Sequence, residues 1–409
     1  MRGRSFGQQR RVPALLLIAV GAVSAAAGAA PADLEAARAA LARGEIEAAI
    51  AAADRAGARS LSSAAALLIR GRARLRQSRF EEAVADLSGA VELDPEGEVG
   101  AAAQMELGPA VLALGDVVGA LKQLQRVRDV YVEQPAAAAV LGLISTIYRV
   151  RFREPAQGSA LQFDAGFAAG SRLDRPVGLE VVGAGDLFIA DDKADRVARF
   201  DPQGLPSGEI SIDEPLALFV EPDGSVGVVA KKAVRTLGDS FQPVALKDGK
   251  RDALDNLVGG ARLASGDLLL LDSKAKIALR FDANRAYLEA FAPGFSEPSA
   301  AAVDRFGRVA LLSQKRRAIG LFDGGGGQVA ALVPGASFSE PVAIAYDRAG
   351  DLFVLDRTGP KVALFDAALR PVGKVVLHPE YREPVALALG SDGALFVLDG
   401  KRKLVTRYQ

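Results

Sequence analysis

The chain of 409 residues has no cysteine, no tryptophan and a single histidine, His378. Without cysteine it forms no disulfide bond, is not a lipoprotein anchored through a cysteine, and cannot build a metal site from cysteine and histidine side chains. The sequence also lacks a Walker-type phosphate loop and a G-x-S-x-G nucleophile elbow. We therefore predict no catalytic residue, no metal and no cofactor, and we interpret His378 as a surface loop residue.

Acidic and basic residues balance, with 50 of each. A chain without net charge gives no global signal for nucleic acid or for an anionic membrane surface, so no nucleic-acid partner is expected. Half of the residues are apolar, as in ordinary globular proteins. At this length we expect two domains.

A long apolar run stands at the N-terminus. Residues 1–11 carry four arginines and no acidic residue, residues 12–29 are apolar or small, and Ala27, Gly28 and Ala29 suit a cleavage site. This order is typical of a secretory signal peptide. We predict a signal peptide over 1–29, a periplasmic or secreted location in a bacterium, and no stable membrane anchor after cleavage. A retained anchor is the alternative, and the Arg10-Arg11 pair leaves twin-arginine and general export both open.

Residues 30–150 are rich in Ala, Leu, Glu and Arg, and apolar positions recur at intervals of three and four. This period predicts amphipathic helices. Weaker copies of one unit begin near Ala30 and Ala101, and Pro109 in the latter should kink its first helix. The clearest unit begins at Ala64 and places small and apolar residues at fixed positions of a repeat of about 34 residues, namely Gly71, Phe80, Ala83, Leu87, Ala90 and Pro95.

This pattern resembles the tetratricopeptide repeat (TPR). The resemblance implies about three TPR-like repeats over 30–134, and we expect a capping helix and linker over 135–157, whose residues 136–150 cover the open end of the stack. It also implies a concave, largely apolar groove that could hold an amphipathic peptide or be covered by the chain's own last helix. By register, the groove residues are Leu34, Leu41, Leu68, Arg72, Leu75, Arg76, Met105 and Leu112.

The remainder of the chain repeats another pattern about every 42 residues. Every copy has a glycine in a predicted turn, at Gly185, Gly224, Gly266, Gly307, Gly350 and Gly393. Nine residues earlier stands a proline or, in the third copy, a leucine: Pro176, Pro215, Leu257, Pro298, Pro341 and Pro384. Six residues later four copies have an aspartate, namely Asp191, Asp272, Asp356 and Asp399, whereas copies two and four have Ala230 and Ser313. Fifteen residues later five copies have an aromatic residue, namely Phe200, Phe281, Phe322, Phe365 and Tyr408.

Each of these positions has a physical reason. Glycine provides the positive φ of a tight hairpin turn, and proline is tolerated at the first residue of a strand because its missing N–H is not needed there. The Val, Ile and Leu runs between them suit buried strands. A period of about 40 residues with four strands per unit predicts a β-propeller, and six copies predict six blades.

The pattern resembles the NHL repeat, whose members fold as six-bladed β-propellers. The resemblance covers 158–409, although copy two lacks the aspartate and the phased aromatic residue, and copy four lacks the aspartate. The predicted fold class is therefore α + β multidomain, with an N-terminal all-α TPR-like helical repeat domain followed by an all-β six-bladed NHL-type propeller. Because the sequence stops just after Tyr408, we expect residues 159–164 to supply the outer strand of the sixth blade and residues 165–175 to form a loop.

The loops between the second and third strands carry a surplus of Lys and Arg, and strand alternation places them on one face. We predict that they bind an anionic polymer or an acidic protein segment. Glutamates in the loops that lead into the blades (Glu214, Glu297, Glu340 and Glu383) would offset part of this charge, and a mixed solvated surface is the alternative. The predicted binding residues are Lys231, Lys232, Lys315, Arg316, Arg317, Lys401, Arg402 and Lys403.

The chain combines two folds that are typical of binding proteins, and we find no catalytic motif in it. We therefore predict a non-enzymatic exported scaffold that binds protein or glycan. The alternative is a propeller-type lyase or hydrolase that acts in the envelope through channel carboxylates. We expect the four repeated aspartates to cap turns and to bond between blades rather than to form a ring of acids. The glycine-rich segment 324–327 is interpreted as a loop between strands, since neither Lys-Ser/Thr nor a helix follows it.

Overall fold

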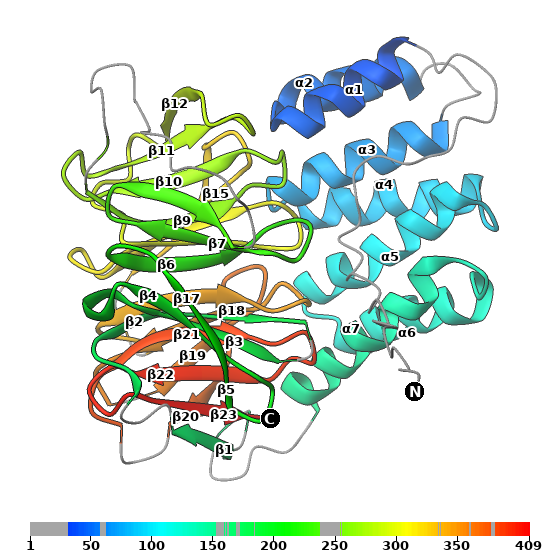
Figure 1. Ribbon diagram of the computed structural model, residues 1–409. Coiled ribbons are helices and arrows are strands. Elements are labelled where there is room, and N and C mark those ends of the chain that lie inside the picture. The colour runs from blue at the N-terminus through cyan, green and yellow to red at the C-terminus, as the bar shows by residue number, and fades with distance from the viewer. Residues whose placement is uncertain are drawn as a thin grey trace, which may run out of the picture.

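The computed structural model describes residues 32–57, 63–152, 163–168, 172–183, 185–237, 256–333, 337–359, 361–377 and 381–409, with Ser159, Leu161, Leu254 and Gly335 as isolated positions. The predicted signal peptide, part of the predicted linker and His378 lie outside these residues. Over the described residues the chain forms a helical domain followed by a six-bladed β-propeller, which confirms the predicted fold class (Figure 1).

The helical part forms three stacked hairpins, α1–α2, α3–α4 and α5–α6, with α7 at the end of the stack (Figure 1). Small residues allow the paired helices to approach closely, since a Cβ atom added to Gly71 would lie 2.9 Å from Cγ of Leu87. None of the described helices is long and apolar enough to cross a membrane. The helices are α1 (Ala32–Arg43), α2 (Ile46–Gly57), α3 (Ser63–Arg76), α4 (Phe80–Leu93), α5 (Glu98–Ala113), α6 (Val117–Val130) and α7 (Pro135–Arg151), and α5 contains Pro109.

The propeller consists of six antiparallel sheets, each built from consecutive strands except for the last. Blade one contains β2 (Pro176–Val182), β3 (Asp186–Asp191), β4 (Arg196–Phe200) and β5 (Pro206–Ser211). Blade two contains β6 (Pro215–Val220), β7 (Val226–Ala230) and β8 (Ala233–Thr236), and blade three β9 (Leu257–Arg262), β10 (Leu268–Asp272), β11 (Ile277–Phe281) and β12 (Tyr287–Phe291). Blade four contains β13 (Ala300–Val303), β14 (Val309–Ser313), β15 (Ala318–Phe322) and β16 (Gln328–Leu332). Blade five contains β17 (Pro341–Tyr346), β18 (Leu352–Asp356), β19 (Lys361–Phe365) and β20 (Pro371–Val376). Blade six contains β21 (Pro384–Leu389), β22 (Leu395–Asp399) and β23 (Leu404–Tyr408), together with β1 (Phe163–Ala168).

The repeated positions have the predicted conformations. All six turn glycines have positive φ, from 78° at Gly393 to 120° at Gly185. Four of the five prolines begin the first strand of a blade, and Pro298 lies two residues before β13. The five aromatic residues are buried, with Phe281 fully enclosed and Phe200 only 4 % exposed. The sequence period therefore marks the blades correctly.

The repeated aspartates cap turns, as predicted, but their bonds stay within a blade. The carboxylate of Asp356 accepts hydrogen bonds from the backbone N–H groups of Ser339 and Glu340, both at 2.9 Å, and of Thr358 at 3.1 Å. Asp399 of blade six likewise accepts hydrogen bonds from the backbone N–H groups of the incoming loop, at Arg382 and Glu383, and of the following turn, at Lys401 and Arg402. Asp356 and Asp399 thus tie the incoming loop of their blade to the following turn. Asp191 accepts from the incoming loop, at Asp174 and Arg175, and Asp272 accepts from the following turn, at Lys274 and Ala275.

The ring is closed by β1, which pairs antiparallel with β23. The closing strand therefore comes from before Pro176, but it is Phe163–Ala168 and not the predicted segment 159–164, and residues expected to form a loop form most of it. Phe163 lies opposite Tyr408, and their rings meet edge to face with centroids 6.2 Å apart. Because an outer strand needs no continuous apolar run, Asp164 and Gly166 are tolerated there and the hydrophobic pattern placed the strand too early.

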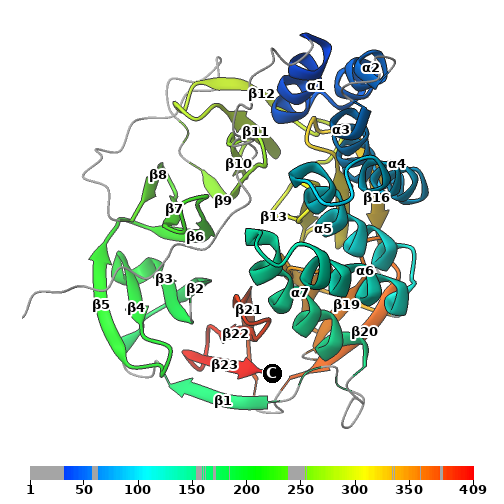
Figure 2. The same ribbon diagram turned by 90° about the vertical axis from the view of Figure 1, so that its right-hand side faces the viewer.

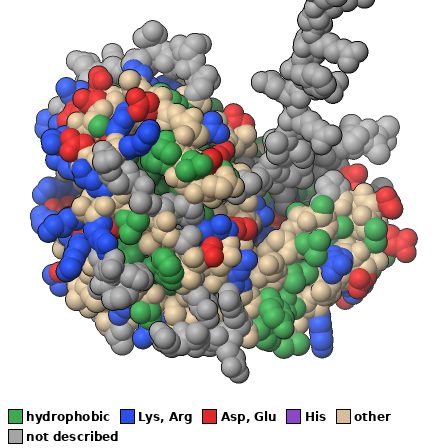
Figure 3. All heavy atoms as spheres, turned by 60° about the horizontal axis from the view of Figure 1, so that its bottom comes forward, with side chains coloured by type: hydrophobic (Ala, Val, Ile, Leu, Met, Phe, Trp, Pro, Cys, Tyr) green, Lys and Arg blue, Asp and Glu red, His purple; other side chains and the backbone are tan. Residues whose placement is uncertain are grey.

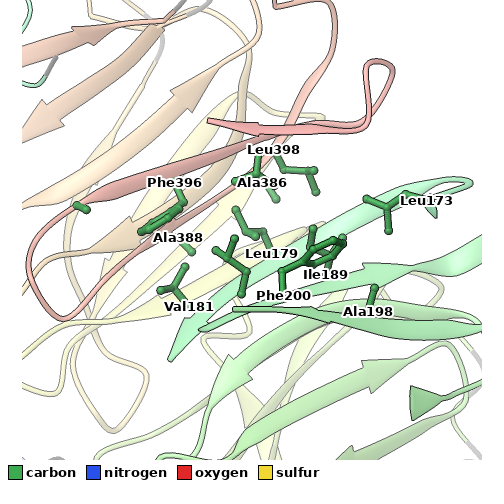
Figure 4. Packing of buried hydrophobic residues seen from close by; sticks show 13 residues of the cluster. Leu173, Leu179, Val181, Ile189, Ala198, Phe200, Ala386, Ala388, Phe396 and Leu398 are labelled. Atoms are coloured by element: carbon green, nitrogen blue, oxygen red, sulfur yellow. The ribbon is translucent and has the colours of Figure 1, made fainter. Parts of the chain in front are cut away.

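A hydrophobic cluster seals the same boundary between blades six and one (Figure 4). Leu179, Ile189 and Phe200 from blade one face Phe396 and Leu398 from blade six, and all five are buried. The ring is therefore closed by strand pairing at its rim and by side-chain packing inside it.

We predict that deletion of residues 163–168 destabilises the propeller. The deletion exposes the backbone of Leu404–Tyr408 and the ring of Tyr408, and should lower the melting temperature by roughly 10 °C or more. Thermal unfolding followed by circular dichroism measures this. A melting temperature equal to that of the intact chain would contradict the closure by β1.

Candidate functional site

The propeller has two faces, and the helices cover part of one. This helical face carries the turns between first and second strands and between third and fourth strands. In Figure 2 the helical stack forms an arc over blades three, four and five, whereas blades one and two are not covered. The opposite face, called the open face below, carries the turns between second and third strands and the loops that lead into each blade.

The predicted TPR groove is closed in this structure. Seven of its eight residues are buried, namely Leu34, Leu41, Leu68, Leu75, Arg76, Met105 and Leu112. Arg72 is partly exposed and lies 3.4 Å from Glu106. Packing between hairpins accounts for part of this burial, because Leu34 and Leu41 belong to the core shared by α1, α2 and α3.

Propeller residues close the rest of the groove. Phe306 and Ala367 join the cluster that contains Leu68 and Leu75, and Ala349 joins the cluster that contains Met105 and Leu112. The sequence left open whether the groove holds a peptide or is covered by the last helix. Among the described residues, propeller side chains pack against it.

Arginines of the propeller contact the C-terminal ends of three successive first helices. A helix C-terminus presents carbonyls without intrahelical donors and a partial negative charge, so a guanidinium is favourable there. Arg280 on β11 donates to the carbonyl of Arg43 at 2.9 Å, at the end of α1. Arg370, between β19 and β20, donates to the carbonyl of Ala113 at 2.6 Å, at the end of α5.

Arg308 in blade four is fully buried and contacts the turn after α3 through a side chain rather than a helix carbonyl. Its Nε donates to Asp304 Oδ2 at 2.6 Å, and its Nη1 donates to Ser78 Oγ at 2.6 Å, just after α3, and to the carbonyl of Ala367 at 2.9 Å. The guanidinium also lies 5.3 Å from the ring centre of Phe80 and 5.2 Å from that of Phe306. One side chain thus joins a helical hairpin to blades four and five.

The sequence pattern did not single out these arginines. Arg308 and Arg370 each follow a turn aspartate by four residues and pair with it, in DRFGR and DAALR. This D-x-x-x-R spacing was the available signal. The glycine-rich segment also belongs to this interface, because a Cβ atom on Gly44 would lie 2.8 Å from the carbonyl oxygen of Gly324.

We predict that Arg308→Ala lowers the free energy of unfolding by about 3 kcal/mol or more, since it leaves the buried carboxylate of Asp304 without its cation. Arg199→Ala is the matched control. Arg199 pairs with Asp186 at 2.9 Å and lies over the ring of Phe188, but its side chain is 46 % exposed. Its loss should cost less than about 1 kcal/mol. Urea unfolding of both variants tests this, and equal losses would contradict the special role of Arg308.

Two buried carboxylates lie where α7 meets blade five. Asp351 accepts a hydrogen bond from Arg151 at 2.5 Å, and Asp347 binds the backbone N–H groups of Ala349 and Asp351 at 2.8 and 2.9 Å. Burial raises the pKa of Asp347 from 3.8 to about 6 and raises the pKa of Asp351 well above its ordinary value, which the charge of Asp347 reinforces. The interface therefore resists full ionisation of the pair.

The raised pKa of Asp347 predicts how stability depends on pH. The unfolded chain releases this proton near pH 3.8 and the folded chain near pH 6, so the folded state loses stability as pH rises through that window. Asp347→Asn removes this loss. Its free energy of unfolding relative to the unmodified chain should rise by roughly 2 to 3 kcal/mol between pH 4 and pH 7.

Urea unfolding at several pH values measures this difference. Asp201→Asn is the control, because Asp201 makes the same two turn bonds, to Gln203 at 3.0 Å and to Leu205 at 2.8 Å, in an exposed turn. It separates the effect of burial from the loss of turn bonds. A difference for Asp347→Asn that stays constant with pH would contradict the assignment.

On the open face, the predicted basic residues lie in turns of three blades, as the strand order requires. Lys and Arg side chains gather along the left side of Figure 3, the side away from the helices. Many are compensated by the incoming loops. Lys231 pairs with Glu214 at 3.0 Å, Lys315 with Glu297 at 2.8 Å, and Arg317 with Glu340 at 3.3 Å.

Arg316 lies 4.0 Å from Glu297, so all three cations of the blade-four turn are close to a carboxylate. Lys232 is exposed beside Lys231. The mixed charge that the sequence allowed as an alternative is therefore present in blades two and four.

Blade six differs because its basic turn borders a hollow. Lys401 and Arg402 are exposed, and Asp399 holds the backbone N–H groups of both at 3.0 Å. The hollow is about 100 Å³ and lies at the seam closed by β1. It is lined by Phe163, Gly166, Tyr381, Asp399, Arg402, Leu404 and Thr406. The sequence predicted the basic residues of this turn, and the structure adds the aromatic side chains of Phe163 and Tyr381 beside them.

Glu180 is the one acidic residue on the six innermost strands β2, β6, β9, β13, β17 and β21. Its Oε1 accepts a hydrogen bond from the N–H of Val181 at 3.0 Å, and burial raises its pKa to about 7. No group of three or more His, Cys, Asp or Glu residues that could hold a metal occurs among the described residues.

No protein-family model matches the chain, and no curated protein sequence matches it. Solved propeller structures do. A streptogramin B lyase matches with a TM-score of 0.46 and 12 % identity, over 62 % of this chain and 99 % of the lyase. The virginiamycin B lyase of Staphylococcus aureus matches with a TM-score of 0.46 and 15 % identity, over 61 % of this chain and 87 % of that enzyme.

Proposed function

We propose that the protein is a non-enzymatic scaffold, exported to the periplasm or secreted, that binds an anionic protein segment or an acidic glycan on the open face of its propeller. In this proposal the helical domain and the propeller act together as one packed unit. The helical groove is filled by the propeller, so the surface left for a partner is the open face and the outer surface of the helices.

The observation that carries this proposal is the hollow of blade six beside its basic turn. Arg402 lines it together with Phe163 and Tyr381, and Lys401 and Lys403 flank Arg402 in sequence. Acidic groups of a partner would be attracted to the turn, while an apolar or sugar-ring surface could contact the aromatic side chains. Because this hollow places aromatic side chains beside the basic turn, blade six is the expected centre of binding.

We predict that reversing Lys401, Arg402 and Lys403 to Glu abolishes retention on a heparin column at low salt. Reversal of Lys315, Arg316 and Arg317 is the matched control with the same change in net charge. It should reduce retention less, because the hollow lined by Phe163, Tyr381 and Arg402 lies at blade six. Retention of the unmodified chain should fall with salt. Equal retention of both variants and the unmodified chain would remove the open face as the binding site.

An enzyme of the propeller type is the second candidate, and Glu180 is the observation in its favour. A carboxyl group whose pKa is about 7 suits proton transfer near neutral pH. A screen of envelope glycans and peptides for cleavage, with Glu180→Gln beside the unmodified chain, distinguishes the two candidates. Turnover that is lost in Glu180→Gln would replace the scaffold proposal, whereas binding without turnover supports it.

A further inference from the structure

The last helix of the stack exposes an apolar stripe. Leu141, Ser145, Tyr148 and Phe152 recur at intervals of four, three and four, which places them on one side of α7 and its C-terminal extension. Leu141 is 51 %, Tyr148 59 % and Phe152 41 % exposed. The rings of Tyr148 and Phe152 stack with centroids 5.1 Å apart and form one continuous apolar surface. This spacing is that of a helix-packing seam.

The other sides of α7 are already used. Val140, Leu143 and Ile147 are buried against α5 and α6. Arg151 pairs with Asp351 of blade five, as described above. The exposed stripe is therefore the side of α7 that neither the stack nor the propeller covers.

Helix α6 forms the second wall of a groove beside this stripe. Val118, which is 55 % exposed, and Leu121 lie opposite Tyr148 and Phe152 and line the same hollow. Lys122, Gln125, Arg126, Asp129 and Val130 complete the α6 wall. Hydrophobic side chains gather on the end of the helical part that faces the viewer in Figure 3. The groove thus has an apolar floor and a polar rim on which Lys122 and Arg126 lie one helical turn apart.

The order of the stack indicates what fits this groove. Each earlier helix of this kind has a partner, because α1 pairs with α2, α3 with α4 and α5 with α6. α7 occupies the position of the first helix of a fourth pair, and the described chain supplies no second helix. The vacant position lies against α7 and α6, where the stripe and Val118 are exposed. An α-helix with one apolar side matches both walls.

The geometry points to a binding site for an amphipathic α-helix of a partner protein. The partner helix carries acidic residues beside its apolar side and occupies the position of an eighth helix in the α6–α7 groove. Its acidic residues, spaced by four, face Lys122 and Arg126, while its apolar residues cover Leu141, Tyr148 and Phe152. This site is separate from the open face of the propeller and does not depend on the function proposed there.

Two other occupants fit less well. The segment before Ala32 corresponds to the predicted signal peptide over 1–29, which cleavage on export would remove. A second copy packed by twofold symmetry would bring Lys122 and Arg126 of both copies to one interface, where Asp129 is the only acidic residue among the described lining residues and offsets half of their charge. A partner helix with acidic residues has neither disadvantage.

The test uses the full chain and two synthetic peptides. Both have leucines at the two seam positions of three heptads, and one carries glutamates while the other carries lysines at the flanking positions. Fluorescence anisotropy of labelled peptides should show binding of the glutamate peptide to the unmodified chain. Tyr148→Ser combined with Leu141→Ser should weaken this binding roughly tenfold or more. Leu288→Ser, which removes a side chain that is 48 % exposed on β12, is the matched control and should leave it unchanged.

Charge reversal makes the test specific. Lys122→Glu with Arg126→Glu should invert the preference, so that the lysine peptide binds better than the glutamate peptide. Reversal of Lys401, Arg402 and Lys403 should leave glutamate-peptide binding unchanged and so separates this site from the open face. Equal binding of both peptides to the unmodified chain would overturn the proposal, and so would no binding of either. A dimer in light scattering that Tyr148→Ser abolishes would overturn it in favour of a second copy.

Discussion

The guanidinium of Arg308 is the contact on which the arrangement of the two domains depends. It is buried between the turn after α3, the turn of its own blade and the turn of blade five, and bonds to Asp304, Ser78 and the carbonyl of Ala367. Its Nη2 atom is buried without a hydrogen-bond partner among the described residues, so the ion pair with Asp304 and the bonds to Ser78 and Ala367 offset the cost of burying the charge. Separating the helices from the propeller would take the hydroxyl of Ser78 and the ring of Phe80 away from this residue. On either side, the buried Arg280 and the exposed Arg370 donate to the last carbonyls of α1 and α5.

These contacts relate the two repeats to each other. A helical repeat of about 34 residues and a blade of about 42 residues are unrelated in sequence, yet each hairpin meets a new blade. The hairpin of α1 meets blade three, that of α3 meets blade four, and that of α5 meets blade five. As a result, propeller residues pack against the predicted groove of the helical stack. The two partner sites proposed above therefore lie elsewhere, on the open face of the propeller and on the uncovered side of α6 and α7.

The sequence predicted the features that depend on residues close together in the chain, such as turns and strand starts. Turn glycines need positive φ, prolines stand at strand starts, and aromatic residues fill the space between sheets, so six blades and their order followed from spacing alone. The closing strand was placed too early because an outer strand such as β1 is exposed and carries no apolar pattern. The interface arginines were missed because their partners, such as Ser78 and Ala113, are more than two hundred residues away. The basic turns were found, but ion pairs such as Lys315 with Glu297 depend on the distance between two loops.

Native-state hydrogen exchange tests most directly whether the helices and the propeller form one body. If the buried contacts of Arg308 couple them, amides in the middle of α3 and α5 and amides in β14 and β18 should open with similar free energies, close to that of global unfolding. If the helices exchange several kcal/mol more readily than these strands, the helical part opens on its own. The TPR-like groove would then be accessible in solution, and the assignment of partner binding to the remaining surfaces would be contradicted.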